Sequence, residues 1–247
     1  MRARLTLLVL AALPSAASAA VPGFEPISHE SSQDFALELR LNSSKPEIDS
    51  AAGLATKPYD STFGGDRQLG LGMELDWQFL RVPHVGSLGV GVGVGRWSTS
   101  AKAVNYVDLS ATGDDTTLEL WQFSGLGVAR LDALADAGIP LVPFAKAGLG
   151  YSLWRAFGPD GTYESKKADG SGHRSVGASY GFQWSAGLAL LLDQLDPSSA
   201  KNLDQAMGVN NTYLFVEYTN ARLRSSTAGN ALWVGGDSYT AGLALEF

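Results

Sequence analysis

The chain has 247 residues, a net charge of −7 and no cysteine. The acidic balance makes nucleic acid an unexpected partner, because nucleic-acid binding depends on neutralising phosphates. The lack of cysteine argues against a small disulfide-stapled scaffold. A mean hydropathy of +0.01 leaves two classes open: a soluble exported domain, and a β-barrel whose strands alternate lipid-facing and lumen-facing residues.

The N-terminus predicts a cleavable signal peptide. Arg2 and Arg4 precede an apolar stretch from Leu5 to Leu13, which the small-residue triplet "ASA" follows. A transmembrane anchor would need about 18 consecutive apolar residues, and Pro14 ends this run early. The expected division of the chain is signal peptide 1–19, flexible periplasmic N-terminus 20–33 and folded domain 34–247.

Alternation of apolar and polar residues recurs along the folded domain and predicts β-strands. In "DFALELRLN" the leucines oppose Glu38 and Arg40, and in "LGLGMELDWQF" the apolar residues oppose Glu74 and Asp76. The same period continues in "LGVGVGVG", "PFAKAGLGYSLWRAF", "VGASYGFQWSAGLALLL", "TYLFVEYTNARL" and "SYTAGLALEF". These segments predict seven strands.

An eighth strand, "TTLELWQFSGLGVAR", is less regular. Trp121 and Phe123 fall on one parity, whereas Leu126 and Val128 fall on the other. A β-bulge would restore a single apolar face. We therefore expect one near Ser124.

The connections between the eight strands alternate in length and predict an antiparallel up-and-down transmembrane β-barrel. Long polar segments on one side alternate with tighter connections on the other, one of which should hold a short periplasmic helix at 197–207. A soluble β-sandwich also alternates. Several segments, however, reach the roughly 9 to 11 residues that a tilted strand needs to cross a membrane, and aromatic residues lie near their ends. These features favour the barrel.

The last strand has the features of an assembly signal. It alternates apolar residues up to a C-terminal aromatic, and it looks like the signal that the outer-membrane insertion machinery reads in barrel substrates. Tyr239, Gly242, Leu245 and Phe247 carry this match. With the signal peptide, it predicts a location in the bacterial outer membrane. The expected partners are that machinery during assembly, membrane lipid and lipopolysaccharide.

Three segments resemble a known group of proteins. "ELDWQFLRVPHVGSLGVGVGVG", "VPFAKAGLGYSLW" and "YTAGLALEF" are similar to uncharacterised outer-membrane β-barrel proteins of myxobacteria, and the resemblance extends from about Phe35 to Phe247. It implies the fold and the location. It implies no catalytic or binding residues.

The polar faces of the strands predict the content of the lumen. An eight-stranded barrel is just wide enough for side chains to fill, and buried charges there should be paired. We expect a lumenal ion-pair network of Glu38, Arg40, Glu74, Asp76, Lys146 and Glu217. A conducting or ligand-binding lumen is the alternative, because inward glycines on the third strand would leave some room.

The sequence offers little for catalysis. Its histidines are His29, His84 and His173. Only His173, beside Asp169, Ser171 and Ser175, could belong to a lipid-modifying site. Neither a metal-ligand spacing nor a cofactor motif is present. We therefore expect a non-enzymatic barrel with a structural or surface-interaction role and four extracellular loops. A narrow porin-like channel is the alternative, and a lipid-modifying enzyme comes third.

Overall fold

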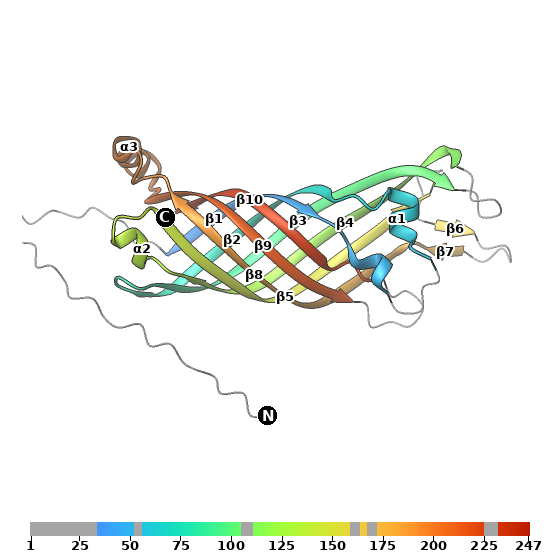
Figure 1. Ribbon diagram of the computed structural model, residues 1–247, viewed down its shortest axis with the longest axis horizontal. Helices are drawn as coiled ribbons and strands as arrows, with labels where there is room; N and C mark the ends of the chain where they lie inside the picture. Colours follow the sequence, from blue (N-terminus) through green and yellow to red (C-terminus); the bar gives the residue numbers. More distant parts are fainter. Residues whose placement is uncertain (1–33, 52–55, 105–110, 159–163, 167–171, 225–231) are drawn as a thin grey trace, which may run out of the picture.

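The computed structural model describes residues 34–51, 56–104, 111–158, 164–166, 172–224 and 232–247. The predicted signal peptide and the N-terminal segment 20–33 lie outside these ranges. Eight antiparallel strands close into a barrel, which confirms the predicted fold (Figure 1). In sequence order they are β1 (Phe35–Ser44), β2 (Gln68–Val82), β3 (Gly86–Val104), β4 (Ala111–Arg130), β5 (Leu141–Phe157), β8 (Val176–Leu191), β9 (Asn211–Arg224) and β10 (Gly236–Glu246).

The first and last strands close the barrel. β1 and β10 pair antiparallel with Leu39 opposite Leu243. Just beyond the ladder, the backbone N–H of Phe35 donates to the carbonyl of Phe247 at 2.8 Å, and the N–H of Phe247 donates back at 2.9 Å. Closure leaves no unpaired sheet edge along this seam.

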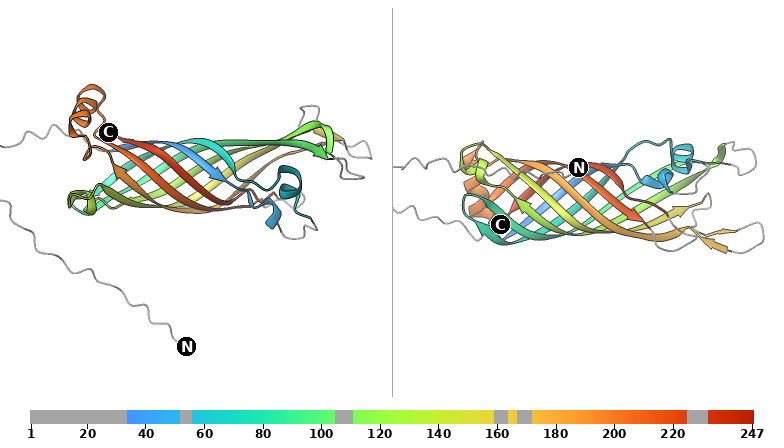
Figure 2. Two further views of the ribbon diagram at one scale, coloured as in Figure 1. Left: turned by 45° about the horizontal axis from the view of Figure 1, so that its top comes forward. Right: turned by 60° about the horizontal axis from the view of Figure 1, so that its bottom comes forward.

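Short elements cover the two ends of the barrel. The end that carries Phe247 also carries α2 (Ala133–Asp136) and α3 (Pro197–Met207), the helix predicted at these positions; we call it the α3 end (Figures 1 and 2). The opposite, α1 end carries the 3₁₀-helix η1 (Glu47–Ser50), α1 (Pro58–Phe63) and a small hairpin of β6 (Glu164–Lys166) and β7 (Gly172–Arg174). None of the helices in the described ranges is long and apolar enough to span a membrane.

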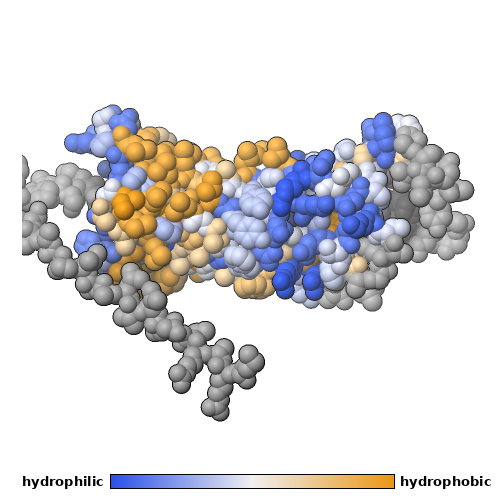
Figure 3. Space-filling model, in the orientation of Figure 1, coloured by the Kyte–Doolittle hydropathy of each residue, from blue (hydrophilic) through white to orange (hydrophobic). Residues whose placement is uncertain are grey.

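The outer wall of the barrel is an apolar belt. Outward side chains such as Leu71, Val92, Leu149 and Val216 are between 61 and 70% exposed. Figure 3 shows this belt in orange toward the α3 end, with a polar band beyond it. A water-soluble sandwich would turn such residues inward, so the wall is built to meet hydrocarbon.

Strand β4 differs from its prediction. Its register with β3 and with β5 runs without interruption past Ser124, so the expected bulge there is wrong. Trp121 and Phe123 point outward, while Leu126 and Val128 point inward and are 7 and 4% exposed. The apolar residues of β4 lie on both faces of the strand because apolar side chains also help to fill this lumen.

Candidate functional site

The candidate site is a cluster of charged side chains inside the barrel. All six side chains expected in the lumen point inward. Glu38 and Arg40 come from β1, Glu74 and Asp76 from β2, Lys146 from β5 and Glu217 from β9. The β1–β2 register brings Glu38 directly opposite Glu74. Like charges placed this way repel each other unless cations lie between them.

Lys146 is the central cation of the cluster. Its Nζ lies 2.8 Å from Glu38 Oε2, contacts Glu74 Oε1, and lies 3.8 and 3.9 Å from oxygens of Glu217 and Asp76. The Lys146 side chain has no exposed surface. One ammonium group thus links carboxylates from three strands, which offsets the large cost of burying each charge alone.

Two arginines complete the ion pairs. Arg40 contacts Glu38 and Glu217, and its Nη1 lies 3.3 Å from Glu74. Arg130, from β4, donates through Nη2 to Glu38 and Asp76 at 3.1 Å each. The sequence analysis missed Arg130, because the expected bulge left the facing of β4 undefined. The charge of Arg130 could have predicted its inward direction, since an arginine at the lipid face would be costly.

The inward glycines of β3 make room for the acidic side chains. A Cβ at Gly91 would contact Asp76 Oδ1, and one at Gly93 would contact Ser124 Oγ and lie 3.3 Å from Glu74 Oε2. The Asp76 carboxylate from the neighbouring β2 therefore takes up the space at Gly91. Gly93 and Gly95 still leave some room, because they line a small cavity in the lumen.

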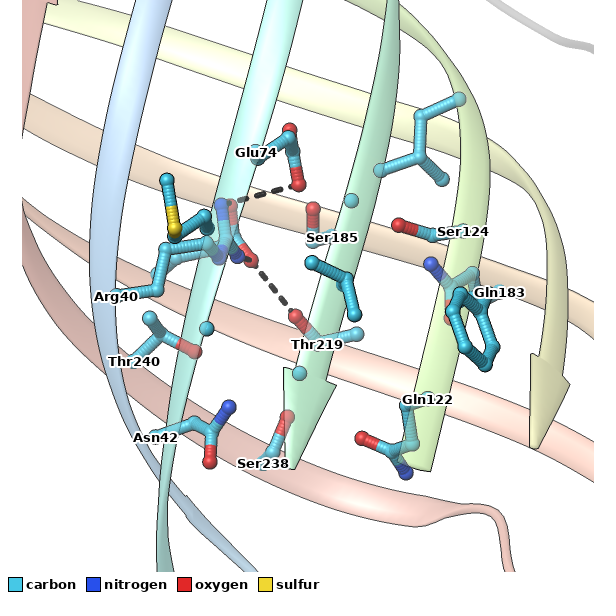
Figure 4. A pocket seen from close by; sticks show the side chains of 18 of the residues that line it. Arg40, Asn42, Glu74, Gln122, Ser124, Gln183, Ser185, Thr219, Ser238 and Thr240 are labelled. Carbon is cyan, nitrogen blue, oxygen red and sulfur yellow. Dashed lines mark hydrogen bonds and ion pairs between the residues drawn. The ribbon is translucent and has the colours of Figure 1, made fainter. Parts of the chain in front are cut away.

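A small polar cavity lies against the cluster on its α1 side. Its volume is about 90 Å³, and Arg40, Glu74 and Glu217 line it. Amide and hydroxyl side chains such as those of Gln122 and Thr219 complete the lining (Figure 4). Within the described residues, Glu217 Oε2 has no hydrogen-bond partner. This size and polarity suit a few ordered water molecules.

An apolar layer closes the lumen at the α1 end. Trp97, Trp154 and Leu223 pack with Ile48 of η1 and Tyr59 of α1, so the first loop reaches into the mouth of the barrel. The sequence analysis expected only long polar connections at this end of the barrel.

Hydrogen bonds hold this first loop in place. Asp49 accepts from the backbone N–H groups of Tyr59 and Asp60 at 2.7 and 3.0 Å, which caps the first turn of α1. Lys45 donates to Asp60 at 2.9 Å, and this hydrogen bond lowers the pKa of Asp60. Burial raises the pKa of the Tyr59 hydroxyl. These hydrogen bonds therefore hold the first loop as an ordered cap over the lumen.

The α3 end is also closed. Phe144, Leu191 and Phe215 belong to a second apolar cluster inside the barrel. Beyond them, the carboxylate of Glu246 accepts four hydrogen bonds, all between 2.6 and 2.9 Å. The donors are Gln78, Arg81, Asn211 and Tyr213.

Lys146 supplies positive charge to a group of three close carboxylates. In the described part of the chain, Glu38, Glu74 and Asp76 form the one group of potential ligands whose oxygens lie within 4.8 Å of one another. The ammonium group of Lys146 reaches each of the three. It occupies the position that a bound cation would take.

The residues of the expected assembly signal lie along β10 and at its end. Tyr239 and Leu245 share the outward face with Phe247, and the Tyr239 ring packs at an angle against that of Tyr218 with 5.6 Å between the ring centres. Gly242 points inward, where a Cβ would contact Phe215. Their role in assembly stays a prediction.

The histidines are not brought together in the described residues. His84, in the β2–β3 turn, lies 3.1 Å from Asp136 of α2 and is exposed. His173 belongs to β7, whereas His29, Asp169 and Ser171 lie outside the described residues. The lipid-modifying hypothesis stays untested.

Comparison with protein-family models and with curated protein sequences finds no match. The fold is similar to that of solved outer-membrane barrels. The outer membrane protein OprG from Pseudomonas aeruginosa is 13% identical over 87% of this chain and 96% of its own, with a TM-score of 0.51. Ail of Yersinia pestis is 10% identical over 87% and 97%, with a TM-score of 0.40. Neisserial surface protein A is 14% identical over 86% and 97%, with a TM-score of 0.42.

Proposed function

We propose that this chain is an integral outer-membrane β-barrel with a structural or surface-interaction role and a closed lumen. The observation that carries the proposal is the position of Lys146, whose ammonium group bridges four carboxylates across the middle of the barrel. Apolar layers on both sides of this cluster support the same reading. A lumen filled in this way stiffens the barrel and opposes the passage of solutes.

The outer wall supports the membrane location and its lipid partners. In this proposal the α3 end is periplasmic and the α1 end is extracellular. On the extracellular side of the apolar belt, the exposed residues include Arg96, Arg155 and Arg222. Arginine side chains suit the phosphate groups of lipopolysaccharide. The insertion machinery remains the proposed partner during assembly, through β10.

The extracellular side also supports a surface role. Strands β3 and β4 continue beyond Arg96, where Lys102 pairs with Asp115 at 2.8 Å and the hydroxyls of Ser100 and Thr117 lie 2.8 Å apart. Figure 1 shows this hairpin rising past the neighbouring strands. It offers a polar surface for contacts outside the cell, and we assign the chain no catalytic role.

A narrow channel is the second candidate, favoured by the polar cavity beside Arg40 and Glu217. Single-channel recording of the refolded protein in planar bilayers decides between the two. We expect no steady conductance steps from preparations whose folding is verified by heat-modifiable gel migration. Reproducible unitary steps from the folded protein would replace the closed-lumen proposal with the channel.

A further inference from the structure

Helix α3 carries an apolar stripe that the rest of the described chain leaves uncovered. The spacing of Ala200, Leu203, Ala206 and Met207 puts these residues on one face, with Ser198, Lys201, Asn202 and Gln205 opposite. Leu203 is 38% exposed, Met207 is 71% exposed, and Leu195 just before the helix is 62% exposed. Helices of soluble proteins usually bury such a stripe against a core.

Both ends of α3 are fixed to the barrel. Before the helix, Asp193 accepts from the backbone N–H of Thr212 on β9 at 3.1 Å. Asp196 accepts from the Ser198 hydroxyl at 2.7 Å. After the helix, Gly208 adopts a left-handed conformation and Val209 is buried. The helix is therefore held in one place, and the exposure of its stripe is a feature of the fold.

The helix stands beside the barrel wall at the edge of the apolar belt. Figures 1 and 2 show α3 projecting sideways from the end of the barrel, and Figure 3 shows the belt beginning next to it. The strands that α3 connects carry outward Leu188, Leu214 and Val216. The exposed stripe therefore stands close to the apolar outer surface of β8 and β9.

We propose that α3 is an interfacial helix whose apolar stripe inserts into the phospholipid headgroup region at the periplasmic rim of the barrel. This inference rests on the proposed membrane location. Amphipathic helices with apolar residues on one face and polar residues on the other lie in the plane of such interfaces. Lys201 and the amide side chains of the opposite face then remain in water. Seated in this way, α3 fixes the depth of the barrel at this rim.

The test uses the absence of cysteine from the chain, which allows single labelling sites. The variants Leu203→Cys and Gln205→Cys carry an environment-sensitive dye on opposite faces of α3, and Val92→Cys carries it in the belt. Each mature protein is refolded into phosphatidylethanolamine and phosphatidylglycerol vesicles. We expect lipid-attached quenchers to quench the dye at Leu203 several-fold more than the dye at Gln205, and aqueous iodide to show the reverse order.

Equal quenching at Leu203 and Gln205, together with strong lipid quenching at Val92, would overturn the helix inference and leave the membrane location intact. Weak lipid quenching at all three sites, Val92 included, would overturn the membrane location itself. Protection of Leu203 from iodide without lipid quenching would overturn the lipid assignment and indicate a second protein surface on α3.

Discussion

At the residue scale, Lys146 is the side chain on which the lumenal charges depend. We expect Lys146→Met to lower the free energy of unfolding by about 3 to 5 kcal/mol, because it leaves four carboxylates facing two arginines in a confined interior. Urea titration of the folded protein in detergent measures the loss. The same change at Lys102, which is 55% exposed and pairs with Asp115 outside the belt, should cost no more than about 1 kcal/mol. Equal small losses at both sites would mean that water screens the cluster.

Which members of this cluster could be predicted depended on how regular each strand is. Glu38 and Glu74 lie in strands whose large apolar residues point outward, so the inward direction of both carboxylates followed from alternation alone. Arg130 lies in β4, where Leu126 and Val128 also point inward. Hydrophobicity no longer distinguishes the two faces there, because a small closed lumen accepts both apolar and charged side chains. The pairing register was needed to place this arginine.

At the element scale, β3 carries Gly91 where β2 places the Asp76 carboxylate against it. We expect Gly91→Ala to destabilise the barrel by about 1 to 3 kcal/mol, because the new Cβ would displace Asp76 Oδ1 from its buried position. Gly95→Ala is the matched control, since its Cβ would lie 3.7 Å from the nearest atom. Thermal unfolding of both variants measures the difference. Indistinguishable midpoints would mean that Asp76 moves aside at no cost.

The short elements were the hardest part of the fold to predict. The 3₁₀-helix η1 and helix α1 are too short to establish an apolar period, yet Ile48 and Tyr59 on them help to close the barrel. Their burial depends on Trp97, Trp154 and Leu223, which come from three distant strands. The helix α3 was predictable because Pro197 and Gly208 mark its ends.

At the scale of the whole molecule, the barrel places an ion-pair network inside and an apolar belt outside. The interior accommodates buried charges because the cations and carboxylates of five strands meet in one network. The exposed apolar side chains of the outer wall are favourable only in contact with hydrocarbon. Alternation along each strand therefore suits one face of the wall to the lumen and the other to lipid. The boundary between the apolar belt and the polar band defines how much of the wall lies in lipid.

This boundary can be tested on a single face of a single strand. Val92 and Ser98 both point outward from β3, Val92 within the belt and Ser98 beyond Arg96. We expect Val92→Arg to cost about 2 to 4 kcal/mol, because the charge must enter the hydrocarbon core, and Ser98→Arg to cost about 0 to 1 kcal/mol near the interface. Two measurements check this: the folded fraction in phospholipid vesicles and the yield in outer-membrane fractions of cells. Both should fall for Val92→Arg, and both should remain close to the parent values for Ser98→Arg. A Val92→Arg protein that folds as well as the parent in vesicles would mean that the belt does not lie in the bilayer.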